Sequence, residues 1–317
     1  MSIRVLMTAV AAAVLLSAVA VSPAAAAGPE GPPLSPSAES LDNAVHCGPD
    51  VETRKTVLLV HGTGSTAAES WSWGYARALT QAGFAVCTVD LPGRSTTSLW
   101  DQSDTMVNAV RDVAALSGQK ISVVGHSQGG FHPLWAIKYW PDVANDIDDY
   151  VGLAPGVRGT ELGNILCAPG TCQDIAWQVS VGSKALTALN SGPLPPSVSY
   201  TSVYTMTDEV IFPQPEGSRI DGAANISVQS ICPGRLVDHA LMLADNVAWA
   251  LALDALAHDG PADAARINRS VCDQPFLPGA DMPGFFTGGV STGTAFTNVL
   301  VNGPRVTLEP PLPDYAR

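Results

Sequence analysis

Apolar residues follow two spacings along this chain, and each spacing predicts one kind of element. Short apolar runs between polar or Gly residues predict buried strands, which we expect at residues 56–60, 84–89, 121–124, 150–153, 200–206 and 224–231. Apolar residues three and four positions apart predict helices, which we expect at residues 67–82, at 101–116, directly after Gly129, and at 238–257. Strands that alternate with helices favour a mostly parallel central sheet flanked by helices, which is an α/β fold.

Two segments lack both spacings. Residues 155–200 are rich in Gly, Pro and Ser and follow a predicted core strand. An irregular insertion at that place is typical of a lid that covers a substrate site. The tail from Pro278 has many Gly, Thr and Pro residues, and we expect it to be a loop.

The first 27 residues are typical of a secretory signal peptide. Arg4 precedes an apolar run that ends in small residues, with cleavage expected after Ala26 or Ala27. A membrane anchor is the alternative, but the apolar core is just under the length that spans a bilayer. We therefore expect a secreted protein without a stable membrane anchor. Residues 28–46 then form an N-terminal arm, and 47–317 form a single catalytic domain of a monomeric protein.

Charge and cysteine content narrow the classes of partner and cofactor. The formal net charge of −13 repels nucleic acid and anionic lipid, so we exclude both as partners. Six cysteines in an exported chain predict three disulfides, with 15 possible pairings. The spacing of Cys167 and Cys172 could suggest a metal, but no pair of His or Cys ligands stands nearby. We expect neither a metal nor another cofactor.

Residues 121–139 carry the clearest functional motif. The apolar run from Ile121 meets Gly125-His126-Ser127-Gln128-Gly129, and an amphipathic segment follows at once. A serine between a strand and a helix, in the pattern G-x-S-x-G, is the nucleophile elbow of α/β-hydrolases. The two glycines avoid crowding of the strand against the helix, and the helix N-terminus favours negative charge near Ser127.

A serine hydroxyl needs a base, and the base needs a carboxylate that orients it. In this fold the chain order is serine, acid, histidine, so only His239 and His258 are candidate bases. His239 follows a predicted strand, whereas His258 lies late in a predicted helix. Asp208 directly follows another predicted strand and is the expected acid. The alternatives for the acid are Glu209, whose side chain should point away from that of Asp208, and Asp238, which is too close in sequence to reach its neighbour's ring.

An oxyanion formed during ester hydrolysis needs two donors that are already in place. We assign one to the backbone N–H of Gln128, directly after the nucleophile. The other should come from the loop after an earlier strand, His61-Gly62-Thr63-Gly64. We choose Thr63, because both its backbone N–H and its hydroxyl can donate.

With these residues placed, the chain resembles the fungal lipase B family of α/β-hydrolases from about Cys47 to the tail. The matching segments include LLVHGTG at 58–64, SQGG at 127–130, LAPGVRGT at 153–160, YTMTDEVIFPQ at 204–214 and DHA at 238–240. The resemblance implies the same nucleophile, acid, base and oxyanion donors. It also implies the pairs Cys47–Cys87 and Cys232–Cys272, which leaves Cys167 with Cys172.

The resemblance also implies a substrate pocket around Ser127, lined by His126, Gly156, Thr160, Val179, Val210, Ile211 and Leu300. Two positions depart from the family type. His126 stands where that type has a bulky aromatic, and Gly156 replaces an acidic residue. Both changes should widen the side that holds the alcohol.

We therefore expect a secreted serine ester hydrolase, and the class that fits best is a lipase. Its partner is an ester or lipid substrate, which can lie at an oil–water interface. A carboxylesterase or polyester hydrolase on the same fold is the nearest alternative. A non-catalytic binding protein is a remote one, since it would be expected to have lost at least one of Ser127, Asp208 and His239.

Overall fold

The computed structural model describes residues 31–34 and 43–317. The expected signal peptide and most of the expected arm lie outside these residues. Seven strands form one sheet in the order β1-β3-β2-β4-β5-β6-β7. Their bounds are Val45–Cys47, Thr56–Val60, Ala85–Val89, Ile121–His126, Ile147–Leu153, Ser199–Tyr204 and Ala224–Ser227 for β1 to β7. Only the short β1 runs antiparallel to its neighbour in this sheet, which confirms the mostly parallel α/β fold. Because β1 begins at Val45, the sheet starts two residues before the expected boundary at Cys47.

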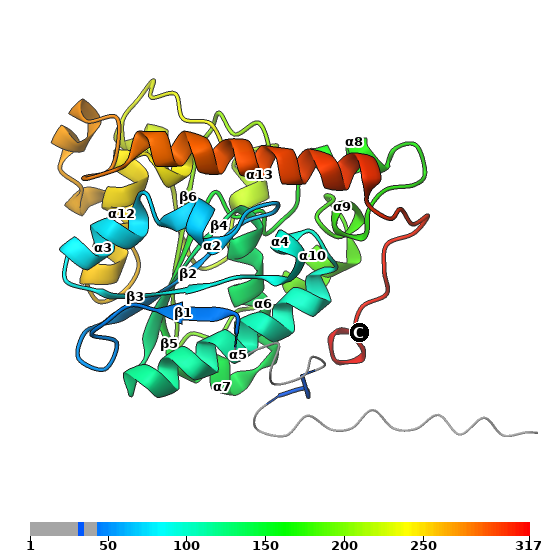
Figure 1. Ribbon diagram of the computed structural model, residues 1–317, viewed down its shortest axis with the longest axis horizontal. Helices are drawn as coiled ribbons and strands as arrows, with labels where there is room; N and C mark the ends of the chain where they lie inside the picture. Colours follow the sequence, from blue (N-terminus) through cyan, green and yellow to red (C-terminus); the bar gives the residue numbers. More distant parts are fainter. Residues whose placement is uncertain (1–30, 35–42) are drawn as a thin grey trace, which may run out of the picture.

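The sheet has an apolar layer on each face. Alternate residues of β2 point to opposite layers: Leu58 and Val60 join one core cluster, and Val57 and Leu59 join the other. Helices α5, α6, α7 and α10 cover the first face, and α3 and α12 cover the second (Figure 1). The helix bounds are Ala67–Trp71, Tyr75–Gln81, Pro92–Ser95, Leu99–Ser117, Phe131–Tyr139, Pro141–Asp146, Glu161–Cys167, Asp174–Gln178, Lys184–Leu189, Val228–Ile231, Asn246–Ala257 and Met282–Asn302 for α2 to α13.

Three expected elements differ most from the structure, and polar caps account for two of these differences. The strand expected at 224–231 ends at Ser227, whose hydroxyl accepts from the Ser230 N–H and starts α11. The helix expected at 238–257 begins at Asn246, because Asp245 accepts from two backbone N–H groups of its first turn. The helix expected at 67–82 is two helices, α2 and α3, with Gly74 in a non-helical conformation between them.

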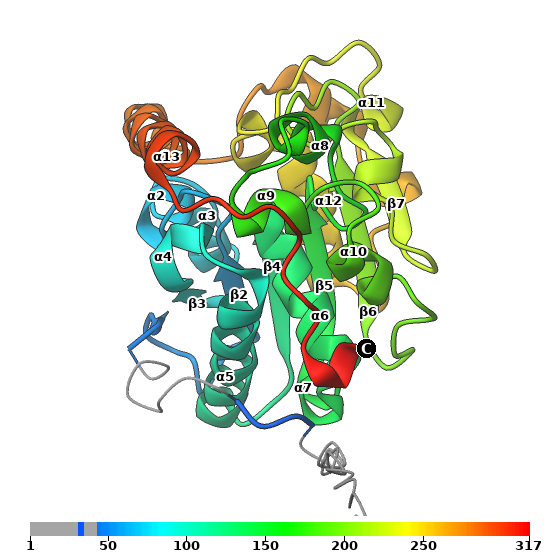
Figure 2. The same ribbon diagram turned by 90° about the vertical axis from the view of Figure 1, so that its right-hand side faces the viewer.

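The expectation of a loop after Pro278 is wrong. Met282–Asn302 is the 21-residue helix α13, capped by the Asp281 carboxylate. It crosses the top of the molecule in Figure 1, beside α2, and the chain then descends to the C-terminus (Figure 2). Gly288 permits the close approach, because a Cβ there would lie 2.6 Å from the backbone oxygen of Glu69 in α2.

The segment 155–200 holds the short helices α8, α9 and α10 rather than irregular chain alone. Three disulfides join Cys167 to Cys172 within it, Cys47 on β1 to Cys87 on β3, and Cys232 to Cys272. These are the pairs that the resemblance implies. No helix in the described ranges combines the length and hydropathy needed to cross a membrane.

Candidate active site

Ser127 lies at the bend between β4 and the 3-10 turn η1 (Ser127–Gly130) that leads into α6. Its φ of 56° is in the left-handed region, which is strained for a residue with a Cβ. The bend needs glycine on both sides of the serine. A Cβ at Gly125 would lie 2.2 Å from the Gly129 oxygen, and one at Gly129 would lie 2.3 Å from the Val60 oxygen. The sequence thus presents the serine at the carboxyl end of the central strand.

His239 and Asp208 form a buried pair at the same end of the sheet. The Nδ1 atom of His239 lies 3.0 Å from Oδ2 of Asp208. The other oxygen, Oδ1, accepts from the backbone N–H groups of Val210 and Ile211 at 3.0 and 2.7 Å. The carboxylate is therefore fixed, and it orients the imidazole with Nε2 free to serve as a base.

The rejected candidates have other contacts. His258 lies at the end of α12, where its Nδ1 is 2.9 Å from the Asp254 carbonyl. Asp238 accepts from the backbone N–H of Leu241, the first residue of the turn η3 (Leu241–Leu243), at 2.7 Å. Glu209 accepts from the backbone N–H of His239 at 3.0 Å, so its carboxylate faces the main chain of the histidine rather than its ring.

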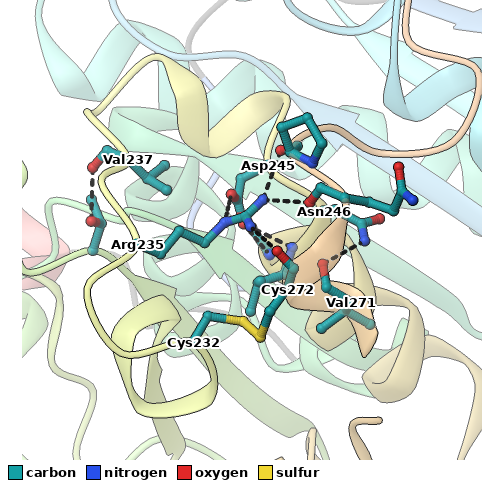
Figure 3. A network of polar contacts seen from close by, with 12 residues as sticks. Cys232, Arg235, Val237, Asp245, Asn246, Val271 and Cys272 are labelled. Atoms are coloured by element: carbon teal, nitrogen blue, oxygen red, sulfur yellow. Dashed lines mark hydrogen bonds and ion pairs between the residues drawn. A yellow bond between two sulfur atoms is a disulfide. The ribbon is translucent and has the colours of Figure 1, made fainter. Parts of the chain in front are cut away.

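The loop that carries His239 is held by Arg235 and by the acid loop. Arg235 forms an ion pair with the buried Asp245 and donates to the backbone oxygens of Cys272, Gln274 and Pro275, next to the Cys232–Cys272 disulfide (Figure 3). The hydroxyls of Thr205 and Thr207 both donate to the Val237 oxygen, at 2.8 and 2.7 Å. These bonds connect the base loop to the segment that carries Asp208.

His126 is a second histidine at the site. Its Nε2 lies 3.0 Å from the His239 carbonyl oxygen, and the two ring centroids are 4.8 Å apart. Burial lowers the pKa of His126 to about 3, so its ring is neutral near neutral pH. The residue before the nucleophile therefore contacts the candidate base directly, which the sequence did not indicate.

The two expected oxyanion donors face each other across the site. The Thr63 hydroxyl donates to Oε1 of Gln128. The Gln128 amide nitrogen in turn lies 3.1 Å from Oε1 of Gln102 and 3.2 Å from Nε2 of the buried His132. These contacts fix the start of η1. His61 fixes the Thr63 loop in a similar way, because its Nδ1–H donates to the Gly62 oxygen while its Nε2 accepts from the Leu91 N–H.

A cavity of about 320 Å³ opens onto Ser127 and His239. All seven residues expected to line the pocket do line it: His126, Gly156, Thr160, Val179, Val210, Ile211 and Leu300. The sequence reasoning missed a set of largely apolar lining residues on α8, α9, α13 and their surroundings: Trp73, Phe131, Leu162, Leu166, Ile175, Leu243, Phe285, Phe296 and Val299. Glu69 of α2 also lines the cavity. Burial alone would raise the pKa of its carboxyl, but bonds from the Ser291 hydroxyl and the Arg94 guanidinium, with the charge of Arg94, outweigh burial and hold the pKa below its ordinary value.

Among the described residues, no group of three or more His, Cys, Asp and Glu side chains could hold a metal ion. A model of the α/β-hydrolase family matches residues 57–291. Lipase B of Pseudozyma antarctica is 30% identical, over 96% of this chain and 93% of that protein. The chain belongs to the lipase B family of α/β-hydrolases. Membership makes it an ester hydrolase.

One solved structure supports this lipase B family assignment, and a second supports the fold. Lipase B of Aspergillus fumigatus has a TM-score of 0.84 and 26% identity, with 92% of this chain and 74% of that one covered. Bacillus licheniformis lipase BlEst2, in its propeptide form, has a TM-score of 0.53 at 15% identity, with 74% and 54% covered. The second likeness concerns the fold alone.

Proposed function

We propose that this lipase B family member hydrolyses lipid esters through an acyl-enzyme on Ser127. One arrangement carries the proposal. A strained, buried serine and a buried His239–Asp208 pair lie at the same end of the sheet. The serine and the histidine both line one apolar cavity. A hydroxyl, a base and an orienting carboxylate in this order are the groups that acyl transfer from an ester requires.

In the proposed reaction, His239 takes the proton of the Ser127 hydroxyl as its oxygen attacks the ester carbonyl. Asp208 accepts from the imidazole Nδ1–H and stabilises the imidazolium. The carbonyl oxygen gains negative charge and is bound by the backbone N–H groups of Thr63 and Gln128 and by the Thr63 hydroxyl. His239 then protonates the leaving alcohol. Water, activated by the same histidine, releases the acid and restores the serine.

The walls of the cavity support an acyl chain as the group that is bound. Side chains such as Leu162, Leu166, Phe296 and Val299 are apolar, and each methylene that they bury contributes about 0.8 kcal/mol. Two of the helices that border the cavity, α8 and α13, also carry exposed apolar side chains. Ile165 on α8 and Phe286 and Val290 on α13 are 60, 63 and 72% exposed. Such residues suit contact with aggregated lipid.

The location and the organisation of the chain complete the proposal. Three disulfides suit an oxidising compartment. We propose export with cleavage after Ala26 or Ala27, and a monomer whose catalytic domain runs from β1 to the C-terminus. N-terminal sequencing of the exported protein tests the cleavage site, and light scattering tests the oligomeric state.

Activity on p-nitrophenyl esters of increasing acyl length, and on emulsified triglyceride, tests the function. We expect hydrolysis of both, and we expect Ser127→Ala, His239→Ala and Asp208→Ala each to lower kcat by several orders of magnitude without loss of fold. Double variants should be little worse than single ones, because the three residues act as a unit. Rates that fall steeply beyond short acyl chains, with no triglyceride hydrolysis, would make the protein a carboxylesterase. Ser127→Ala with wild-type kcat would refute the nucleophile.

A further inference from the structure

The peptide groups on both sides of the His239 Cα carbon are held by side chains that neighbour the other two members of the candidate triad. Glu209, next to Asp208, accepts from the His239 N–H at 3.0 Å. His126, next to Ser127, has its Nε2 3.0 Å from the His239 carbonyl oxygen. The histidine main chain is thus bonded to the acid loop on one side and to the nucleophile strand on the other.

The direction of the His126 hydrogen bond follows from the chemistry of its two atoms. A carbonyl oxygen only accepts, so Nε2 of His126 carries the proton and donates it. The side chain is 7% exposed, and the low pKa that follows from burial keeps the ring in its neutral, one-proton form. The bond therefore persists through the pH range in which a serine hydrolase works.

The local chain gives a reason for such bonds. His239 lies in the loop between α11 (Val228–Ile231) and η3 (Leu241–Leu243), where no helix or strand fixes its backbone. A shift of about 1 Å in a catalytic group can cost on the order of 10²-fold in rate. Side chains must therefore fix the position of the His239 backbone. Those of His126 and Glu209 bond to the two peptide groups of His239 itself.

We propose that His126 and Glu209 are positioning residues that fix the backbone of His239 relative to Ser127 and Asp208. The inference rests on the proposed function, since it assumes that His239 is the base. It gives His126 a task beyond its place in the pocket wall. It also gives a role to the exposed Glu209, which the sequence presented only as an alternative to Asp208 for the acid.

The first test compares His126→Leu, which removes the donor, with His126→Gln, whose amide N–H can reach the same oxygen. With p-nitrophenyl butyrate as substrate, we expect His126→Leu to lower kcat about 10- to 100-fold with KM changed less than threefold. We expect His126→Gln to recover most of the loss. Wild-type kcat in His126→Leu, or equal losses in both variants, would overturn the positioning role.

The same substitution in the His239→Ala background separates positioning from effects on the pocket. If His126 acts through His239, His126→Leu should lower the residual kcat of His239→Ala by less than about twofold. A further loss as large as in the wild-type background would show that His126 acts on the substrate instead. Wild-type activity in His239→Ala would refute the proposed function itself. Failure of the positioning role and failure of the proposed function therefore give different results.

Glu209 supplies a second test, on an exposed side chain whose loss the fold should tolerate. Glu209→Ala removes the acceptor and should lower kcat about 3- to 10-fold across the whole pH range. Glu209→Gln keeps an acceptor for the same N–H, so we expect it to recover most of the lost kcat. Equal kcat for Glu209→Ala and wild type would remove Glu209 from the proposal.

Discussion

At the residue scale, the Thr63 hydroxyl has two possible partners during catalysis. In the free protein it donates to Oε1 of Gln128, and in the proposed reaction it donates to the developing oxyanion. The Gln128 side chain has further partners in Gln102 and His132, so it stays anchored when the hydroxyl rotates away. We infer that this bond holds the hydroxyl ready beside the reacting carbonyl.

Replacing this hydroxyl should therefore affect the transition state more than binding. We expect Thr63→Val to lower kcat about 10²-fold with little change in KM, because one oxyanion donor is worth on the order of 10²–10³ in kcat. Thr63→Ser keeps the hydroxyl and should recover most of the rate. Steady-state kinetics on one short-chain ester distinguish the cases. A loss below threefold in Thr63→Val would show that only backbone N–H groups bind the oxyanion.

The sequence pointed to the candidate catalytic residues but not to the residues that support them. Ser127, Asp208 and His239 were recognisable because acyl transfer demands particular residue types in a particular chain order. The contact of His126 with His239 joins residues 113 positions apart, and that of Thr63 with Gln128 joins residues 65 apart. Such contacts depend on how separate loops meet in space, and no local pattern encodes that.

At the element scale, the many Gly, Thr and Pro residues after Pro278 led to the wrong expectation of a loop where the helix α13 lies. Its 21 residues include Gly284, Gly288, Gly289 and Gly293, each of which disfavours an isolated helix by about 1 kcal/mol. Yet its pocket-lining positions Phe285, Gly288, Thr292, Phe296 and Val299 recur at helical spacing. Contact with α2 and with the cavity stabilises a helix that its residues alone would not.

Two neighbouring glycines of α13 test this packing. A Cβ at Gly288 would lie 2.6 Å from the Glu69 backbone oxygen, whereas one at Gly289 meets no atom within 4 Å. Gly289→Ala should raise stability by up to about 1 kcal/mol through helix propensity. Gly288→Ala should instead lower Tm and raise KM for long-chain esters, because α13 must move away from α2. Thermal melts and ester kinetics on both variants check this, and equal stabilisation by both would contradict the close contact.

At the scale of the whole molecule, the parallel sheet followed from strands that alternate with helices, and most strands were located to within a few residues. The boundaries that were wrong, at Ser227 and at Asn246, are set by side chains that cap a helix start. In both places apolar residues stand on both sides of the cap, so hydrophobic spacing alone cannot show where the chain changes direction. Local hydrogen bonds decide it.

Buried histidines distributed through the molecule make its stability depend on pH. Burial lowers the pKa of His126 and of His132 to about 3 and lowers that of His61 as well. A free histidine titrates near 6.5. Between about pH 3 and 6.5 the unfolded chain therefore binds protons that the native protein does not, so stability falls as the pH decreases through this window. At pH 5 each of the first two histidines costs about 2 kcal/mol relative to neutral pH.

Urea unfolding at pH 8, 6 and 5 measures this dependence, and His132→Gln isolates one contribution to it. His132 is fully buried on α6, where its ring nitrogens contact the side chains of Ser103 and Gln128. The variant should be less stable than wild type at pH 8, because those contacts change. Its loss of stability between pH 6 and 5 should nevertheless be smaller, by about 1 kcal/mol, because one proton fewer is taken up on unfolding. If the free energy of unfolding fell equally with pH in the two proteins, His132 would take up no proton on unfolding in this window. The acid sensitivity would then have to come from the carboxylates.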